Sequence, residues 1–438
     1  MFKTIRNALK TPDVRKKLLY TLILIVVFRL GCYITVPGVD SFQLAEVLNN
    51  QGIASLIDLI SGGAFSRLSI FAMSISPYIT ASIVIQLLGM VIPSLERLTK
   101  EGGEEGRNKI NRYTKLLTVV LALIEGLGIY LSYRSSGIFV DTTFITGATV
   151  VLSLMAGTAL LMWLGDQITS KGIGNGISII IFVGIVAGLP SAITTIWNLI
   201  FGVGAFSTTG LLIALAIIIG AIILVAGVVF VQQAERRVPV QYSKRVVGRK
   251  MYGGQSTNIP IKVAAGGVMP IIFASSIMAF PATIVRLVSG GNMPTAGLGY
   301  YILGCLSAGY ASAWWTSLVY AILYALLILF FTYFYSSIQF NPIELANNMK
   351  KSGGYIPGIR PGKPTSDYIG KISSRLNLVG AFFLAIIAIL PVIVGAIFNV
   401  TALQIGGTSL LIMEGVALET VRQIESQMTM RHYKGFLE

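Results

Sequence analysis

GLLIALAIIIGAIILVAGVVFV, residues 210–231, contains no charged residue, and the segment that follows it, 232–265, carries seven Lys and Arg residues. A helix needs about 20 apolar residues to cross a hydrocarbon core about 30 Å thick. Residues 210–231 therefore predict a membrane-spanning helix. Because basic residues are retained on the cytoplasmic side of a membrane, the segment 232–265 indicates the side on which this helix ends.

Nine other apolar stretches of about this length occur along the chain. Together they predict ten transmembrane helices, at 18–36, 70–92, 116–133, 146–165, 177–197, 210–231, 266–288, 314–338, 376–398 and 402–421. The composition agrees, because 54% of the residues are hydrophobic and 12% are charged, whereas about a quarter of the residues of a soluble domain are charged. The spans and their connections leave no room for a separate soluble domain.

Most basic residues fall on one side of the predicted spans. Of the 33 Lys and Arg residues, 29 lie on alternate connections. These connections are 1–17, 93–115, 166–176, 232–265, 339–375 and 422–438. The pattern predicts that the N-terminal segment 1–17 and the C-terminal tail 422–438 are cytoplasmic. Attraction to anionic lipid is a simpler explanation for residues 1–17, but 232–265 and 339–375 are longer than topology requires.

The spans divide into two sets of five. Residues 18–197 hold the first five, 198–209 form an external connection, and 210–421 hold the last five. An odd number of spans gives the two halves opposite orientations, which is typical of inverted repeats with a pathway between them. We therefore predict an all-α polytopic membrane protein with ten transmembrane helices in two pseudo-symmetric, inverted five-helix halves.

Several classes of enzyme are excluded by motifs that the sequence lacks. It contains neither a G-x-x-x-x-G-K-[ST] phosphate-binding motif nor an H-E-x-x-H zinc motif. Its one histidine, His432, lies on the tail, and its two cysteines, Cys32 and Cys305, are far apart in the sequence. We therefore expect no catalytic residue, no metal site and no cofactor, so a partner must supply any energy.

Charged residues within the spans leave transport of a small solute as an alternative function. Arg29 and Glu125 lie at similar depths and could pair, and Glu414 and Glu419 make residues 402–421 the least apolar span. Charged side chains in a membrane usually face the interior of a helix bundle or water. A proton-coupled transporter would contain more acids and histidines, and a purely structural role for Arg29 and Glu125 fits equally well.

A short apolar segment precedes the second span. Residues 56–68 read LIDLISGGAFSRL, which is too short to cross a bilayer and is interrupted by Gly62 and Gly63. Irregular backbone at membrane depth occurs only where protein or a water-filled cavity surrounds it. We predict a small re-entrant helix among the spans. A helix lying flat on the outer surface is the alternative.

Segments spread over the whole chain resemble those of the SecY family, the central subunit of the bacterial protein-conducting channel. They are SGGAFSR (61–67) leading to ISPYITASI (75–83), KGIGNGIS (171–178), QSTNIP (255–260), PIIFASS (270–276), IRPG (359–362) and GGTSLLI (406–412). They occur in order, with spacing like that of the family. The chain departs from the family at MEG (413–415), where the family is more apolar.

The resemblance implies an hourglass-shaped channel between the halves, closed at mid-membrane by a ring of aliphatic side chains. The matching positions are Ile75, Ile79, Ile177, Ile181, Ile272 and Ile412. Ile75 and Ile79 are four residues apart, like Ile177 and Ile181, so each pair shares a helix face. A ring of branched apolar groups excludes water and ions, and it requires no specific hydrogen bond from a polypeptide. Without the resemblance, these isoleucines would be interpreted as packing or lipid-facing residues.

The resemblance also makes residues 56–68 a plug on the outer side of the ring, and spans 2, 3, 7 and 8 a lateral gate toward lipid. The plug positions are Leu59, Ile60, Gly62, Gly63, Phe65 and Arg67. The gate positions are Gln86, Ser276 and Phe280. A hydrogen bond from Gln86 across the gate helices would contribute about 1 kcal/mol, or the glutamine could tie two static helices together. The two glycines could act as a hinge or simply end a helix.

Finally, the resemblance implies a role in the Sec translocon of the bacterial inner membrane, where unfolded secretory polypeptides pass outward and transmembrane segments leave into lipid. The expected docking positions are Arg236, Arg237, Lys244, Arg245, Arg249, Lys250 and Arg360. They would bind ribosomal RNA phosphate or the SecA motor ATPase. Arg360, beside Pro361 and Gly362 at a predicted turn, is the main candidate for coupling to both. The other implied partners are SecE-type and SecG-type membrane subunits, signal sequences, nascent polypeptides and anionic lipids.

Overall fold

The computed structural model describes most of the chain. The described residues are 10–40, 44, 62–100, 102–134, 137–202, 208–242, 245–247, 250–252, 256–263, 266–288, 298–306, 314–398 and 401–434. Ten helices in these ranges coincide with the ten predicted spans. They are α2 (Pro12–Gly31), α5 (Ser76–Val91), α7 (Gly103–Tyr133), α8 (Phe144–Lys171), α9 (Gly176–Phe201), α10 (Thr208–Gln233), α11 (Met269–Val288), α13 (Trp314–Gln339), α15 (Lys363–Phe398) and α16 (Thr401–Lys434).

The helices have the length and composition expected of a multi-pass membrane protein. Within the described residues, α7, α8, α10, α13 and α15 each contain a stretch long and apolar enough to cross a membrane, and α5, α9 and α11 contain shorter apolar helices. Many large apolar side chains on their outer faces are exposed, such as Leu212 of α10 and Phe382 of α15. The predicted fold class of a helical, polytopic membrane protein is confirmed.

Several predicted span boundaries differ from the structure. Helix α7 begins at Gly103 rather than at residue 116, and α15 begins at Lys363 rather than at residue 376. Helix α2 ends at Gly31 rather than at residue 36, and α5 begins at Ser76 rather than at residue 70. Between them, the described residues 32–36 and 68–70 are non-helical because these two segments pair with each other: Val36 N donates to Leu68 O at 3.0 Å and Ile70 N donates to Ile34 O at 3.0 Å. Helix α5 begins at Ser76 because Pro77, which lacks an N–H, fits the first turn of a helix.

The connections contain ordered elements that the sequence did not predict. Three are short helices: α6 (Pro93–Lys100), α12 (Leu298–Leu306) and α14 (Pro342–Lys351). Strand β1 (Glu235–Tyr242) pairs antiparallel with both β4 (Ser256–Lys262) and β5 (Gly354–Tyr355). Strands β2 (Arg245–Val247) and β3 (Lys250–Tyr252) form a separate hairpin. The segments 232–265 and 339–375 therefore share one sheet, and we call the end of the molecule that carries it the basic end.

The two halves repeat the same pattern of helix contacts. In the first half, α5 contacts α7, α7 contacts α8, α8 contacts α9, and α2 contacts both α8 and α9. In the second half, α11 contacts α13, α13 contacts α15, α15 contacts α16, and α10 contacts both α15 and α16. Helix α2 thus corresponds to α10, α5 to α11, and so on in order. This equivalence agrees with the predicted pseudo-symmetric halves.

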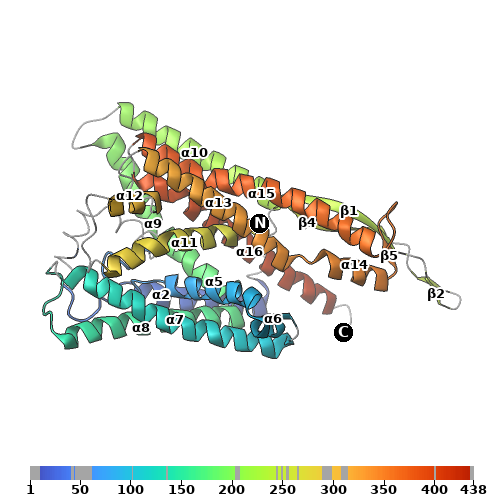
Figure 1. Ribbon diagram of the computed structural model, residues 1–438, viewed down its shortest axis with the longest axis horizontal. Coiled ribbons are helices and arrows are strands. Elements are labelled where there is room, and N and C mark those ends of the chain that lie inside the picture. Colours follow the sequence, from blue (N-terminus) through green and yellow to red (C-terminus); the bar gives the residue numbers. More distant parts are fainter. Residues whose placement is uncertain are drawn as a thin grey trace.

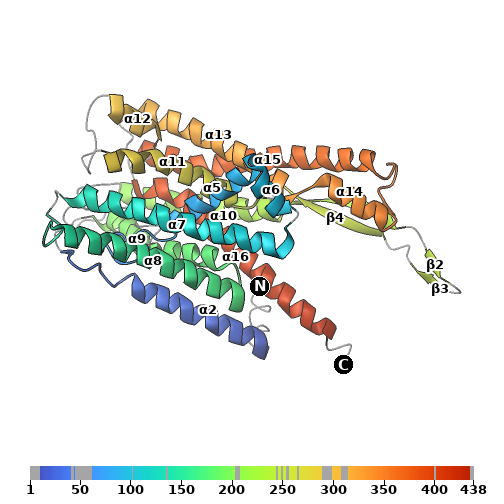
Figure 2. The same cartoon turned by 60° about the horizontal axis from the view of Figure 1, so that its bottom comes forward.

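The halves meet along two seams. At the first seam, α11 of the second half contacts α5 and α7 of the first. At the second seam, α9 contacts α10 and α16, and α2 contacts α16. In Figure 1, α7 and α8 lie at the bottom, α10, α13 and α15 at the top, and α11 between them. Figure 2, which turns the molecule by 60°, shows β4 and α14 beside one end of α15 at the basic end, with the β2–β3 hairpin farthest out.

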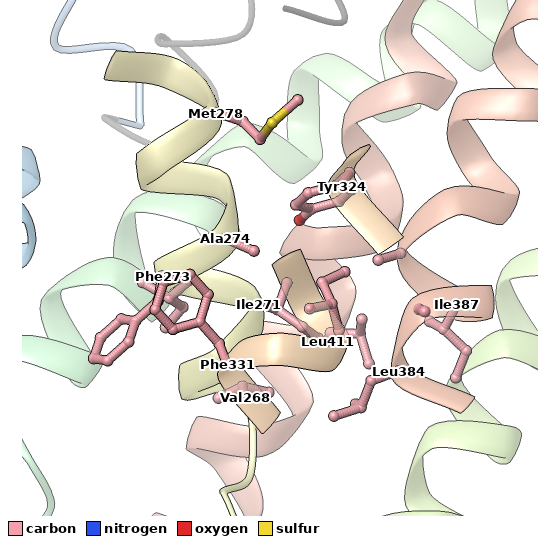
Figure 3. Packing of buried hydrophobic residues seen from close by; sticks show 14 of the residues in the cluster. Val268, Ile271, Phe273, Ala274, Met278, Tyr324, Phe331, Leu384, Ile387 and Leu411 are labelled. Carbon is pink, nitrogen blue, oxygen red and sulfur yellow. The ribbon is translucent and has the colours of Figure 1, made fainter. Parts of the chain in front are cut away.

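Each half has its own apolar core. The core of the second half joins α10, α11, α13, α15 and α16, with residues such as Ile271, Phe331, Leu384 and Leu411 each at most 1% exposed (Figure 3). The Phe273 and Phe331 rings meet edge to face with centroids 5.8 Å apart. The first half has a matching core between α2, α8 and α9. The surface between these two cores is where a pathway is expected.

Candidate functional site

The six predicted ring isoleucines lie on four helices from both halves. Ile75 is the residue before α5 and Ile79 lies in its first turn, while Ile177 and Ile181 lie in the first two turns of α9. Ile272 and Ile412 lie on α11 and α16. Three of them, Ile75, Ile181 and Ile272, are buried. The other three are half-buried.

Four of the predicted ring residues lie where the cores of the two halves meet. Ile79 and Ile412 are partly buried, and each packs against the core of the first half and also against the core of the second. Ile75 belongs to the first core and Ile272 to the second. The structure therefore brings these four predicted residues to one apolar junction between the halves.

A cavity of about 360 Å³ opens on one side of this junction. Ile181, Ile272 and Ile412 form part of its wall. The other lining residues include the polar or charged side chains of Asn175, Ser178, Gln232, Lys262, Glu419 and Arg422. Gln232 lies at the end of α10 and Lys262 at the end of β4, next to the sheet, so this side of the cavity lies toward the basic end. The cavity wall thus combines polar and charged side chains with three of the predicted ring isoleucines.

The turn before α9 fixes two ring residues. The Asn175 side-chain oxygen accepts from the backbone N–H groups of Ile177 at 3.1 Å and Ser178 at 3.3 Å, which satisfies donors at the start of the helix. Gly176 N donates to Thr169 Oγ1 at 2.9 Å. A Cβ on Gly176 would overlap the carbonyl oxygen of Gly165. The KGIGNGIS motif therefore places Ile177 and Ile181 by close contact with α8.

The predicted plug falls partly within the described residues. Leu59 and Ile60 lie outside them, and residues 62–68 form turns rather than the predicted helix. Phe65 is 2% exposed and Leu68 is fully buried. The burial contradicts the alternative of a helix lying flat on the surface, at least for residues 62–68. The backbone is turn-like because Gly62 and Gly63 have φ of +65° and +87°, and Leu68 has φ of +43°, which α-helices do not contain.

Two arginines bind this segment to the end of α2. Arg29 Nη1 donates to Gly62 O at 2.9 Å. The Arg67 guanidinium lies over the ring of Tyr33, 4.1 Å from its centroid. No ion pair among the described residues joins Arg29 to Glu125, so the predicted pairing is wrong. The sequence could not show this, because Gly62 O is a backbone group that carries no signature in the amino-acid pattern.

The three predicted gate residues lie on two of the three helices that make the first seam. Gln86 lies on α5, and Ser276 and Phe280 lie on α11. The Gln86 side-chain amide donates to Ser82 Oγ at 3.1 Å within α5, rather than across the seam. Ser276 Oγ donates to Ile272 O at 2.8 Å within α11. Phe280 is 50% exposed.

The predicted docking residues that the structure describes lie at the basic end. Arg236 and Arg237 are exposed on β1, where Arg237 Nε pairs with Glu235 Oε1 at 2.9 Å. Arg245 and Lys250 belong to the β2–β3 hairpin, while Lys244 and Arg249 lie outside the described residues. Arg360 is exposed and lies in a turn, and its backbone carbonyl oxygen accepts a hydrogen bond from Thr365 Oγ1 at 2.8 Å. The turn predicted around Arg360 is confirmed.

The comparison of this chain with known proteins identifies one family. The family model described as SecY matches residues 69–421. A protein translocase subunit SecY of Streptomyces scabiei is 45% identical over 452 residues, covering all of both chains. The subunit of the same name from Halalkalibacterium halodurans is 45% identical over 443 residues, and the one from Mycobacterium tuberculosis is 42% identical over 466 residues, again over all of both chains.

Solved structures have the same fold. One described as a protein conducting channel has a TM-score of 0.63 and 20% identity, covering 94% of this chain and 92% of that one. Another, which concerns the plug domain of SecY in the closed state, has a TM-score of 0.65 with the same identity and coverage. Sec61 from the canine ribosome–channel complex has a TM-score of 0.58 and 18% identity, covering 94% of this chain and 92% of that one.

Proposed function

This chain belongs to the SecY family, and we propose on that premise that it forms the channel of a protein translocase. The resemblance of its motifs to this family is confirmed. The channel conducts unfolded polypeptides across a membrane and releases apolar segments sideways into lipid. The observation that carries the proposal is the junction of Ile75, Ile79, Ile272 and Ile412, which lies between two cores, with Ile272 and Ile412 in the cavity wall.

The ring of isoleucines seals the resting channel against water and ions. Branched apolar side chains at the junction expose no hydrogen-bonding group, so water and ions lose hydration without compensation when they enter. A translocating chain displaces the isoleucines and is contacted by side chains that make no sequence-specific hydrogen bonds. The polar and charged side chains of the cavity wall keep the entering chain hydrated up to the ring. This arrangement suits a transported polymer of varied sequence, and a small solute would require a specific polar site instead.

The plug and the lateral gate complete the proposed channel. Residues 62–68 are the described part of the plug, and they lie next to the ring because Gly62 packs against Gly184, three residues after Ile181. The gate is the first seam, whose α5 and α11 carry Gln86, Ser276 and Phe280. Phe280 supports this assignment, because a half-exposed aromatic ring at a seam is available to an apolar signal helix.

The partners follow from the charge at the basic end. Exposed arginines on β1 and at residue 360 offer cations to ribosomal RNA phosphate or to acidic groups on the SecA motor. SecE-type and SecG-type subunits complete the assembly within the membrane, and anionic lipids contact the basic loops. The protein lies in the bacterial inner membrane with both termini in the cytoplasm. It makes and breaks no covalent bond, because the motor or the ribosome supplies the energy.

A photo-crosslinking experiment tests the channel. A photo-crosslinker is placed at Ile272, and a ribosome is stalled on a signal-bearing secretory chain in membranes that contain the protein. We expect crosslinks from Ile272 to the mature part of the nascent chain, and crosslinks from the signal to Phe280 or Gln86. The matched control is a crosslinker at Leu411, which is fully buried in the second core one residue before the ring position Ile412. Equal crosslinking at Leu411 and Ile272, or none at Ile272 with ribosomes bound, would contradict the proposal.

A charge reversal tests the docking surface. The Arg360→Glu variant should assemble normally and lose motor-driven export, because it presents an anion where an acidic partner binds. The control is Lys10→Glu, which reverses another exposed charge, outside the segments 232–265 and 339–375. Normal export by Arg360→Glu would remove this residue from the docking surface without affecting the assignment of the channel.

A further inference from the structure

A buried polar cluster joins α13 to α15. Asn377 of α15 and Ser336 of α13 are 5% and 4% exposed. The Asn377 side-chain amide Nδ2 donates to Ser336 Oγ across the two helices, and to Ser373 Oγ within α15 at 3.4 Å. A second bond between these helices, from Tyr333 Oη to Ser374 O at 3.5 Å, is exposed and long for a hydroxyl donor. The Asn377–Ser336 bond is therefore the buried polar link between α13 and α15 in the described part of the chain.

Stability alone does not explain the amide at this position. Asn377 Oδ1 is buried and has no hydrogen-bond partner among the described residues, which costs free energy. The serines do not depend on the amide, because a buried hydroxyl can donate to the carbonyl four residues earlier, as Thr332 Oγ1 does to Ile328 O at 2.7 Å. What the amide adds is geometry, since one buried polar contact can fix the register of two helices even at a cost in stability.

Helix α15 begins within the docking surface at the basic end. Thr365 Oγ1 donates to Arg360 O at 2.8 Å, which ties the first turn of α15 to the docking turn. Ile369, farther along α15, is buried in a cluster with Val240 of β1 and Met349 of α14. The sheet and α14 are thus packed onto the start of α15, and α14 also follows α13 along the chain after a short connection. The docking surface is therefore attached to both helices.

Helix α13 contacts the gate helix α11 at the level of the polar cluster. The ring of Tyr335, the residue before Ser336, lies with its centroid 5.7 Å from that of Phe273 on α11. The Phe331 ring, one turn earlier, is 5.8 Å from the same ring (Figure 3). Phe273 follows the predicted ring residue Ile272 and is buried. Consecutive residues of α13 therefore contact α11 on one side and α15 on the other.

We propose that Asn377 is a positioning residue that pins α15 to α13, so that a partner docking at the basic end moves α11 and opens the first seam. The inference rests on the proposed channel function and adds a residue that none of the sequence motifs contains. Two helices leave the docking surface in contact with each other, so helices free to slide would absorb a tilt of that surface by slipping.

The contacts farther along α13 and α15 cannot prevent such slipping. Residues such as Ile328 and Leu384 are apolar, and apolar contacts within a membrane are exchanged at little cost. The directional bond from Asn377 to Ser336 resists the slip, so that α13 and α15 move together against Phe273. The coupling thus runs through packed and hydrogen-bonded neighbours, and it is measurable as a free energy between the docking surface and the gate.

The test measures opening of the first seam when a partner docks. The full-length protein, with its membrane partners, is placed in lipid nanodiscs after Cys32 and Cys305 are replaced by Ala, and spin labels are attached at residues 86 and 276. Pulsed electron resonance gives the ratio of wide to narrow distances, with and without the purified SecA motor and a non-hydrolysable ATP analogue. With no further substitution, the motor should raise this ratio about fivefold or more, the usual size of coupling between two sites. In Asn377→Leu, the motor should bind with the same affinity and leave the ratio unchanged.

Two serine variants make the same chemical change on either side of Asn377. Ser336→Ala removes the bond between the helices, whereas Ser373→Ala removes the bond within α15, and both positions are buried. We expect Ser336→Ala to lose the effect of the motor and Ser373→Ala to keep it. Tyr333→Phe, which removes the exposed bond between the same helices, should also keep it. If Asn377→Leu fails to accumulate in the membrane, the two serine variants still provide the comparison.

A signal peptide added without the motor separates positioning from a merely structural role. Because the peptide acts at the first seam itself, it should widen the distance in Asn377→Leu as it does in the wild type. The midpoint of thermal unfolding in detergent should not fall, because leucine removes a buried acceptor that has no described partner. A residue needed only for folding would instead lower the midpoint and weaken the responses to the peptide and to the motor alike.

Several results would overturn the role of Asn377. They are a motor response of wild-type size in Asn377→Leu, equal responses in Ser336→Ala and Ser373→Ala, weaker binding of the motor by Asn377→Leu, or a lower unfolding midpoint together with loss of both responses. A wild-type distance that does not respond to the motor would also overturn it. Export of a precursor with an intact signal is measured in parallel. Failure of export by the wild-type protein would contradict the channel function itself, whereas normal export with any of the other results would contradict only the role of Asn377.

Discussion

The two seams between the halves are built from different contacts. At the first seam, Ile79, Ile83 and Leu87 of α5 pack into the apolar core around α11. At the second seam, Val14 of α2 is buried with Ile173 and Ile424. Lys17 Nζ also donates there to Gln427 Oε1 at 3.4 Å, a hydrogen bond that joins α2 to α16.

This difference explains which seam can open. Lipid tails are as apolar as isoleucine, so a seam of apolar side chains within a membrane exchanges protein contacts for lipid contacts at little cost. The second seam buries apolar side chains in the core, where Val416 of α16 lies with Ile179 and Ile180 of α9, and also in the cluster of Val14, Ile173 and Ile424. Exposing such buried apolar surface to water costs about 25 cal/mol per Å². The first seam is therefore suited to part toward lipid, and the second is suited to hold the halves together.

Crosslinking each seam should have the largest effect. Cys32 and Cys305 are first replaced by Ala. Gln86→Cys with Ser276→Cys then allows a bis-maleimide to bridge the first seam, and Lys17→Cys with Gln427→Cys allows it to bridge the second. We expect the first bridge to abolish export, measured by protease protection of a precursor in membrane vesicles, because the gate cannot part. The second bridge should leave export near the wild-type level.

Single-cysteine variants treated with the same reagent are the controls for this experiment. Loss of export with both bridges would mean that the second seam also moves. Normal export with a verified bridge at the first seam would show that polypeptides pass without separation of α5 from α11.

A core substitution at the second seam should reduce stability. Ile173 is 1% exposed in the cluster that joins α2 to α16. Ile173→Ala should lower the free energy of unfolding by about 2–5 kcal/mol, the usual cost of removing a buried isoleucine. The measurement is thermal unfolding of the purified protein in detergent. Ile284→Ala, at a 43% exposed position on α11, should cost much less, and equal losses would contradict the distinction between the seams.

A polar substitution in the ring should relax selectivity. Ile272→Asn introduces an amide at the apolar junction, where it recruits water and weakens the seal. Precursors with defective signals should then be exported. The measurement is the fraction of such a precursor that is processed in cells. The control is Ile328→Asn, because Ile328 is fully buried in the second core on α13, a helix that carries no predicted ring residue. Unchanged rejection of defective signals by Ile272→Asn would remove this residue from the ring.

The smallest effect is expected at Gln86. Because its amide donates to Ser82 within α5, Gln86→Leu removes no described bond across the first seam. We expect a change of less than about 1 kcal/mol in the equilibrium of gate opening, seen as a small shift in the signal hydrophobicity needed for export. A change as large as that of Ile272→Asn would show that Gln86 bonds across the seam in a state other than this one.

The spans could be predicted because their causes are local. Hydrophobic length and the distribution of basic residues follow directly from the energetics of a helix in lipid, and the ten helices coincide with the ten predicted stretches. The ring isoleucines could be identified only through the resemblance to the SecY family. In composition and spacing they look like any packing residue on a membrane helix.

The features that were missed depend on contacts between distant residues. The sheet at the basic end pairs Gln241 with both Ser256 and Tyr355, and three segments this far apart share no local pattern. In β1, apolar and other residues do alternate in the sequence, and the structure buries Val238 and Val240 between exposed neighbours. This alternation could have indicated a strand. The early end of α2 and the Arg29–Gly62 bond depend on how residues 62–70 fold back, which hydrophobicity does not encode.

The most direct test of this account measures distances across both seams in one protein. Spin labels are attached at residues 86 and 276 in one sample and at residues 17 and 427 in another, and distances are measured by pulsed electron resonance with and without a bound signal peptide. We predict that the distance across the first seam increases on binding and that the distance across the second seam stays the same. An increase across the second seam with no change across the first would contradict the account.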